Sequence, residues 1–73
     1  MAEHVQVHIR DESIRLGQFL KLADFIDNGS DAKWVLMQGT VEVNGELETR
    51  RGRQLTVGDV VTFEGRSAVV TQG

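Results

Sequence analysis

The segment at residues 39–49 constrains the fold most, because it places two alternating runs on either side of a turn that few dipeptides can form. The alternating apolar or β-branched positions are Val41 and Val43 before the turn, and Leu47 and Thr49 after it. Between them lies Asn44-Gly45, and Asn and Gly most readily adopt the positive φ angles of a two-residue hairpin turn. The segment therefore predicts a tight β-hairpin.

Three of the eight basic residues follow this hairpin within four positions: Arg50, Arg51 and Arg53. The net charge of −3 argues against a nucleic-acid binder, but a surface anion feels mainly the charges within a Debye length of about 8 Å. Guanidiniums suit phosphate because their planar fork bonds two oxygens at once. The residues alone leave two interpretations open. One is an RNA-binding surface shared with Arg15, Lys21 and Lys33; the other is that Arg50 and Arg51 form surface ion pairs with Glu42, Glu46 or Glu48.

Upstream of the hairpin, the apolar pattern changes from the period of a strand to that of a helix. Residues 5–9 alternate apolar and polar side chains, which predicts a half-buried strand. From residue 18 onward, positions i, i+3, i+4 and i+7 form one apolar helix face. The residues of this face are Phe19, Leu22, Ala23 and Ile26. We expect Gly17 to be the N-cap of this helix and Asn28-Gly29 to end it.

A second short helix is expected from Ser30, a good N-cap, to a stop at Gly39. Two helices joined by so few residues pack as a helical hairpin. On the second helix, Trp34 and Met37 either form a stacking platform for a base or cover the core. In a chain with one tryptophan, three phenylalanines and no tyrosine, we favour the second interpretation.

After the arginines, residues 60–63 and 67–71 predict a second hairpin, with its turn at Gly65-Arg66. The element order is then strand, two helices and several short strands. This order predicts one α+β domain over residues 1–73, in which two antiparallel helices pack on a small, mainly antiparallel sheet.

Composition excludes several classes of protein. The chain has no cysteine, and no apolar run approaches the roughly 20 residues of a membrane-spanning helix. The N-terminus lacks the pattern of a secretory signal, so we expect a cytoplasmic protein. His4 and His8 lie about 13 Å apart on a strand, too far to share one metal ion. We therefore expect neither a metal nor a cofactor.

The sequence also lacks the combinations of residues that common catalytic sites need. A nucleophilic triad needs a base next to an activated serine or cysteine, whereas Ser13 and Ser30 are explained as turn and cap residues. Acidic pairs such as Glu46 and Glu48 are expected on a solvated face, without the burial that shifts a pKa. No phosphate-cradling loop of the GxxxxGK[ST] form is present. The chain is predicted not to be an enzyme.

Four segments at their observed intervals resemble an S4-like RNA-binding domain. They are residues 16–23 (LGQFLKLA), 31–33 (DAK), 39–45 (GTVEVNG) and 57–60 (VGDV). More narrowly, the chain resembles the small stand-alone YbcJ-type group, in which a segment like residues 48–52 (ETRRG) follows the turn. The resemblance spans residues 13–64 and implies the αL fold, with two antiparallel helices on a short bent sheet.

The resemblance also implies that the helical pair and the adjoining hairpin contact structured RNA of the ribosomal or transfer class. Carried over position by position, the RNA-binding residues are Lys21, Lys33, Asn44, Gly45, Arg50, Arg51 and Arg53. One departure is Asn28-Gly29, which stands where many S4 domains carry Ser-Arg.

The resulting hypothesis is a monomeric, non-enzymatic RNA-binding protein that has no membrane partner and acts alone or on a ribonucleoprotein. With four phosphate contacts, its affinity should fall roughly fifty-fold between 50 and 200 mM salt. Three alternatives stay open: a protein-interaction module that uses a sheet edge at residues 5–9, an accessory domain of a ribonucleoprotein, and a fragment of an RNA-modifying enzyme.

Overall fold

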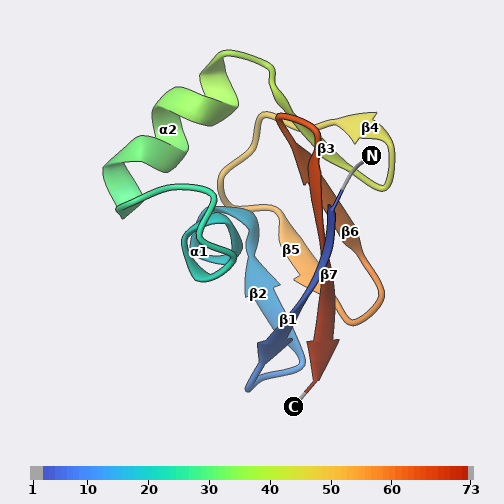
Figure 1. The fold of residues 1–73 in the computed structure, drawn as a ribbon. Coiled ribbons are helices and arrows are strands. Elements are labelled where there is room, and N and C mark those ends of the chain that lie inside the picture. Colours follow the sequence, from blue (N-terminus) through green and yellow to red (C-terminus); the bar gives the residue numbers. More distant parts are fainter. Residues whose placement is uncertain (1–2, 73) are drawn as a thin grey trace.

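Two helices lie on one side of a sheet in the structure, a computed structural model that describes residues 3–72 and their side chains except those of residues 3, 4, 29 and 30 (Figure 1). The elements are, in order, β1 (Glu3–Ile9), β2 (Ser13–Arg15), α1 (Leu16–Leu22), α2 (Gly29–Met37), β3 (Val41–Val43), β4 (Glu46–Leu47), β5 (Gln54–Thr56), β6 (Val60–Phe63) and β7 (Arg66–Gln72). Within this range no helix has the length and apolar character needed to cross a bilayer.

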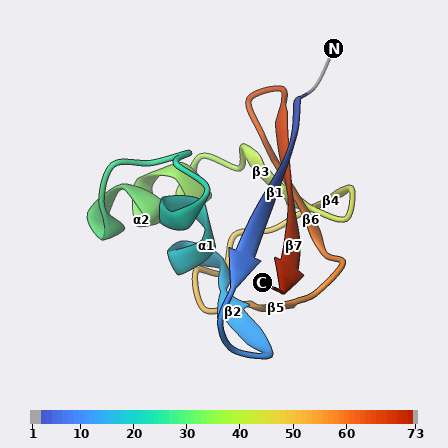
Figure 2. The ribbon, with the colours of Figure 1, turned by 60° about the horizontal axis from the view of Figure 1, so that its bottom comes forward.

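The main sheet has the order β1-β7-β6-β3-β4, and its strands are antiparallel except for β1 beside β7. A second sheet pairs β2 with β5 in antiparallel fashion, directly below α1 (Figure 2). The predicted α+β class with a mainly antiparallel sheet is confirmed. β1 forms an edge of the sheet, as expected for residues 5–9.

Both hairpins form, and the two central residues of each turn take positive φ angles. At the first turn φ is 54° for Asn44 and 84° for Gly45, as the sequence predicts. The second turn uses Glu64 and Gly65, with φ of 50° and 78°, one residue earlier than expected. Arg66 is accordingly the first residue of β7 and not part of the turn.

The predicted extent of the first helix is wrong at both ends. Its N-cap is Arg15, with φ −76° and ψ 146°, while Gly17 already lies in the helix. The helix ends at Leu22 because Asp24 takes a left-handed φ of 62°. The Asp24 amide donates to the Lys21 carbonyl (3.1 Å), and the Phe25 amide donates to the Leu20 carbonyl (2.9 Å). These two hydrogen bonds form a Schellman motif.

This early ending changes which side chains are buried. Leu22, expected on the apolar face, is 53% exposed, whereas Phe25 and Ile26 are buried from a non-helical segment. The N-cap of the next helix lies two residues before the expected Ser30. It is Asn28, whose Oδ1 accepts a hydrogen bond from the Asp31 amide at 3.3 Å.

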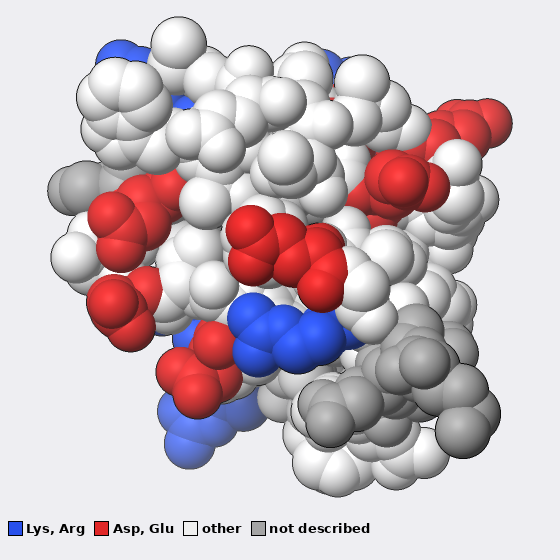
Figure 3. Space-filling view, turned by 45° about the horizontal axis from the view of Figure 1, so that its top comes forward, with Lys and Arg blue, Asp and Glu red and all other residues white. Residues whose placement is uncertain are grey.

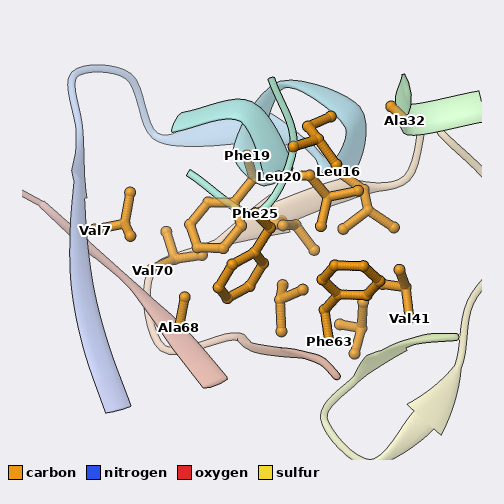
Figure 4. Packing of buried hydrophobic residues seen from close by; sticks show 14 of the residues in the cluster. Val7, Leu16, Phe19, Leu20, Phe25, Ala32, Val41, Phe63, Ala68 and Val70 are labelled. Atoms are coloured by element: carbon orange, nitrogen blue, oxygen red, sulfur yellow. The ribbon is translucent and has the colours of Figure 1, made fainter. Parts of the chain in front are cut away.

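The core lies between α1 and the sheet (Figure 4). Leu16, Phe19 and Leu20 of α1 have no exposed surface, and they face Phe63 and Val70 of the sheet. Burying one such side chain contributes roughly 1.5–3 kcal/mol. The position of α1, and of everything attached to its outer surface, is therefore fixed by the core.

Candidate functional site

A buried carboxylate organises the segment that follows the first hairpin. Glu48 is only 6% exposed and accepts five hydrogen bonds. Its Oε2 accepts from the amides of Thr49 and Arg50 at 2.9 and 3.0 Å and from Arg50 Nε at 3.1 Å. Its Oε1 accepts from Nη2 of Arg50 and Nη1 of Arg53, both at 3.0 Å. The side-chain bond from Arg50, helped by the other bonds, lowers the pKa of Glu48 to about 2.

The prediction that Glu48 lies on a solvated face is wrong, and the hairpin register explains why. In this hairpin Glu42 pairs with Leu47 and Val43 with Glu46, and the Glu48 amide donates to the Val41 carbonyl at 3.0 Å. Residues opposite each other share a face of the sheet. The pairing places Leu47, 62% exposed, on the face of exposed Glu42 and Glu48 on the face of buried Val41, while Glu46 is exposed beside the turn although Val43 opposite it is buried.

Glu48 divides the arginine cluster into two kinds of side chain. Arg50 and Arg53 are both ion-paired to it, so the ion-pair interpretation holds for Arg50, whereas the pair with Arg53 was not expected. The Arg50 side chain stays 73% exposed despite its pairing, whereas that of Arg53 is 28% exposed. Arg51 forms no ion pair with any side chain that the structure describes.

The loop at residues 50–53 docks on the first turn of α1 through its backbone. The Leu16 amide donates to the Arg53 carbonyl at 2.8 Å, and the Gly17 amide donates to the Arg51 carbonyl at 3.0 Å. The loop thus supplies acceptors for amides that have no partner within the helix. A Cβ at Gly17 would lie 2.5 Å from Cγ of Arg51, so glycine is what lets the Arg51 side chain pack against the helix.

This docking creates an open hollow of about 440 Å³ between α1, the loop and α2. The residues that line it are Arg15, Gly17, Gln18, Lys21, Ala32, Arg51 and Gly52. Three of the lining residues are cationic and none is acidic. Arg15, Lys21 and Arg51 are all exposed, so their charges face solvent around one concave surface. Such a surface can hold the oxyanions of a ligand.

The structure brings together only some of the predicted site residues. Lys21 and Arg51 line the hollow, with Arg15, which the sequence placed in the basic group but not among the contacts. The sequence analysis did not include Gln18 in the site. Its position one helical turn before Lys21 indicates that the two side chains share a face of the helix. Lys33 is exposed on α2 outside the lining.

The tip of the first hairpin is tied to a neighbouring turn. The Asn44 side chain donates to Asp59 at 3.0 Å and accepts from the Val60 amide at 2.9 Å. Burial alone would raise the pKa of Asp59, but hydrogen bonds from Thr56 and Asn44 outweigh it and lower this pKa. Asn44 therefore fixes the tip of the hairpin against β6.

The face of the molecule shown in Figure 3 carries no second basic area. On that face, basic side chains lie beside acidic ones or at the margin, and no continuous basic surface forms (Figure 3). The cationic hollow is thus a local feature of a chain whose net charge is −3. Among the described residues, no group of three or more His, Asp and Glu side chains is placed to hold a metal ion. The side chain of His4 lies outside the described part of the chain.

Another expectation is corrected on α2. Trp34 and Met37, assigned to the core, are 67% and 68% exposed. Ala32 and Leu36 face the core instead, each 1% exposed.

Comparison with known proteins gives consistent matches. The S4 domain family matches residues 7–71 of the chain. The probable ribosome maturation protein RlbA of Bacillus subtilis (strain 168) is 58% identical over 59 residues, covering 81% of this chain and 83% of that protein. The putative RNA-binding protein YbcJ of Escherichia coli (strain K12) is 35% identical over 57 residues, covering 78% of this chain and 81% of that protein.

A solved structure matches as well. The solution structure of YbcJ from E. coli, described as having an αL motif involved in RNA binding, is similar with a TM-score of 0.66 and 28% identity. The match covers 97% of this chain and 89% of that one. These matches confirm the resemblance to S4 domains and the αL arrangement. They also support the prediction of a non-enzymatic protein, since the relatives' names describe RNA binding and ribosome maturation.

Proposed function

We propose, from the premise that this chain belongs to the S4 domain family, that it is a non-enzymatic protein that binds structured ribosomal RNA in the cytoplasm. The relatives named for RNA binding and ribosome maturation support the class of ligand. The observation that carries the proposal is the hollow in which Arg15, Lys21 and Arg51 meet without an acidic neighbour in the lining.

The chemistry of this hollow suits an RNA backbone. Structured RNA is recognised mainly by its shape, its phosphates and its 2′-hydroxyls, because side chains cannot enter its deep, narrow major groove. The guanidiniums of Arg15 and Arg51 each offer a planar fork to a phosphate, and Lys21 offers a point charge. The amide of Gln18 can bond a 2′-hydroxyl.

The other predicted contacts receive different roles in this proposal. Exposed Arg50 and Lys33 contact phosphates at the margin of the site. Arg53, Asn44 and Gly45 shape the loop and the hairpin that hold Arg51 in place. RNA thus meets an Arg51 side chain that already packs against Gly17, which reduces the entropy lost on association.

Salt dependence gives the first test. From the three phosphate contacts of the hollow alone, affinity for a ribosomal RNA hairpin is expected to fall at least about 20- to 40-fold between 50 and 200 mM salt, because each contact releases condensed counterions. Fluorescence anisotropy of a dye-labelled hairpin measures this, and a DNA hairpin of the same sequence is the control that lacks 2′-hydroxyls. Absence of binding to any ribosomal RNA hairpin at 50 mM salt would overturn the proposal.

A glycine variant made in two backgrounds tests whether the position of Arg51 matters. In Gly17→Ala the new methyl meets Cγ of Arg51 at 2.5 Å, so the arginine must leave its place. We expect RNA affinity to fall about 3- to 10-fold, while the gain in helix propensity keeps the melting temperature nearly unchanged. The same change in an Arg51→Ala background is the control, since no arginine side chain is then left to displace. An equal loss of affinity in both backgrounds would show that the placement of Arg51 is unimportant.

A further inference from the structure

We propose that the outward face of α2 stacks one unpaired RNA base on Trp34, so that the RNA ligand carries an unpaired nucleotide beside its helical part. This inference rests on the proposed RNA-binding function and names a feature of the ligand that the basic hollow does not specify. It concerns side chains that belong neither to the core nor to the lining of the hollow.

The indole of Trp34 is largely exposed and does not belong to the core. Trp34 and Met37 are 67% and 68% exposed, and the aromatic contact among the described residues joins Phe25 to Phe63 instead. At about 3.6 residues per turn, Lys33, Trp34 and Met37 fall within one arc of roughly 100°, on the side of α2 that faces away from the core. Their side chains form one outward face with an aromatic, an aliphatic and a cationic member.

The size and charge of this face favour a base over a protein. A stable protein partner would need about 800 Å² of surface on each side, and a single helical turn bordered by polar Gln38 and Thr40 does not offer that. A base needs one flat apolar surface of its own size, and any base has a π-face that stacks on an indole. Lys33, on the same face, supplies a cation for the phosphate attached to that base.

The hollow and this face lie on different sides of α2. Ala32, which lines the hollow, lies two residues before Trp34 on the same helix, about 3 Å away along its axis and roughly 160° around it, so one RNA reaches both by passing around the helix. Sequence-specific RNA recognition uses bases that have left the helical stack and rest on aromatic side chains. A paired segment in the hollow and an unpaired base on Trp34 then belong to neighbouring parts of one RNA.

The single tryptophan makes the test direct, because all indole emission comes from Trp34. Two ribosomal RNA hairpins with the same stem are compared, one fully paired and one with a single unpaired adenosine. Indole fluorescence is read in parallel with the anisotropy of a dye on the RNA. We expect the bulged hairpin to bind more tightly and to quench the indole, and the paired hairpin to bind without quenching.

Variants of the exposed residue complete the test. Trp34→Ala is expected to weaken binding of the bulged hairpin about 5- to 150-fold, which corresponds to the 1–3 kcal/mol of a stacked base, and to leave the paired hairpin unchanged. Trp34→Phe should restore part of the difference. Val57→Ala, at another exposed apolar residue (51%), is the control and should change neither affinity. Circular dichroism verifies that each variant is folded.

The outcomes separate this inference from the function on which it rests. If both hairpins bind equally, with unchanged indole emission, the stacking site is refuted while RNA binding stands. If Trp34→Ala keeps its RNA affinity and instead loses a ribosomal protein that co-purifies with the wild type, the face is a protein-docking site and the inference is also refuted. If the wild type binds neither hairpin at 50 mM salt, the proposed function itself fails.

Discussion

Replacing Arg15, Lys21 and Arg51 together with alanine is expected to lower the affinity for structured RNA at least about 100-fold. A charge-assisted hydrogen bond to a phosphate contributes about 1.5 kcal/mol or more, and side chains that do not contact one another contribute nearly additively. The dependence of affinity on salt should flatten in parallel, because each lost phosphate contact lowers the slope by about one. Anisotropy titrations at several salt concentrations measure both quantities.

A matched pair of single variants controls for the loss of charge. Arg50→Ala and Arg51→Ala remove the same charge at adjacent positions, but Arg50 is held by Glu48 and Arg51 lies open in the hollow. We expect Arg51→Ala to weaken binding about tenfold and Arg50→Ala about threefold or less. Similar losses in the two variants would mean that total charge, and not the hollow, determines affinity.

Glu48→Gln is expected to lower the free energy of unfolding by about 2 kcal/mol, because a neutral amide cannot pair with two guanidiniums and two backbone amides from a buried position. In a domain of this size that corresponds to a fall in melting temperature of about 10 °C. Glu46→Gln, at an exposed position two residues earlier, is the control and should change stability little. Thermal unfolding followed by circular dichroism provides the comparison.

The difference in stability between wild type and Glu48→Gln is expected to depend on pH. The pKa of Glu48 is lowered from 4.5 to about 2 in the fold, so the stabilisation is fully present above pH 4.5 and is lost as the pH falls toward 2. The stability difference between wild type and Glu48→Gln should therefore shrink across this window, as the wild-type carboxyl becomes neutral like the amide. A difference that stays constant down to pH 2 would show that the charge of Glu48 is not what stabilises the loop.

The sequence predicted well those features that depend on a few neighbouring residues. The turn at Asn44-Gly45 follows from the backbone preferences of two residues, and it formed at the expected place. The end of α1 was not predicted, because the residue in the left-handed position is Asp24 and not a glycine. The apolar spacing continued past this point because Phe25 and Ile26 enter the core from a non-helical segment, which periodicity alone cannot distinguish from a helix.

The sequence predicted that three arginines belong to the candidate site. It did not predict that Arg50 and Arg53 pair with Glu48 while Arg51 does not. The distinction depends on Glu48, whose burial follows from pairing across the hairpin and not from alternation along one strand. Counting outward from the two-residue turn places Glu48 opposite Val41, so the sequence did contain this signal. The contact of Arg51 with Gly17 was beyond the sequence, because it depends on how a distant loop docks on α1.

The pairing of β1 with β7 has a consequence for how the chain folds during synthesis. Within the described sheet β1 is bonded only to β7, and their register joins Glu3 to Arg66. A nascent chain can therefore form its two helices and its first hairpin before β7, the partner of β1, has been synthesised. Contacts between residues so far apart in sequence form slowly, so the first strand is expected to be the last to become protected from hydrogen exchange.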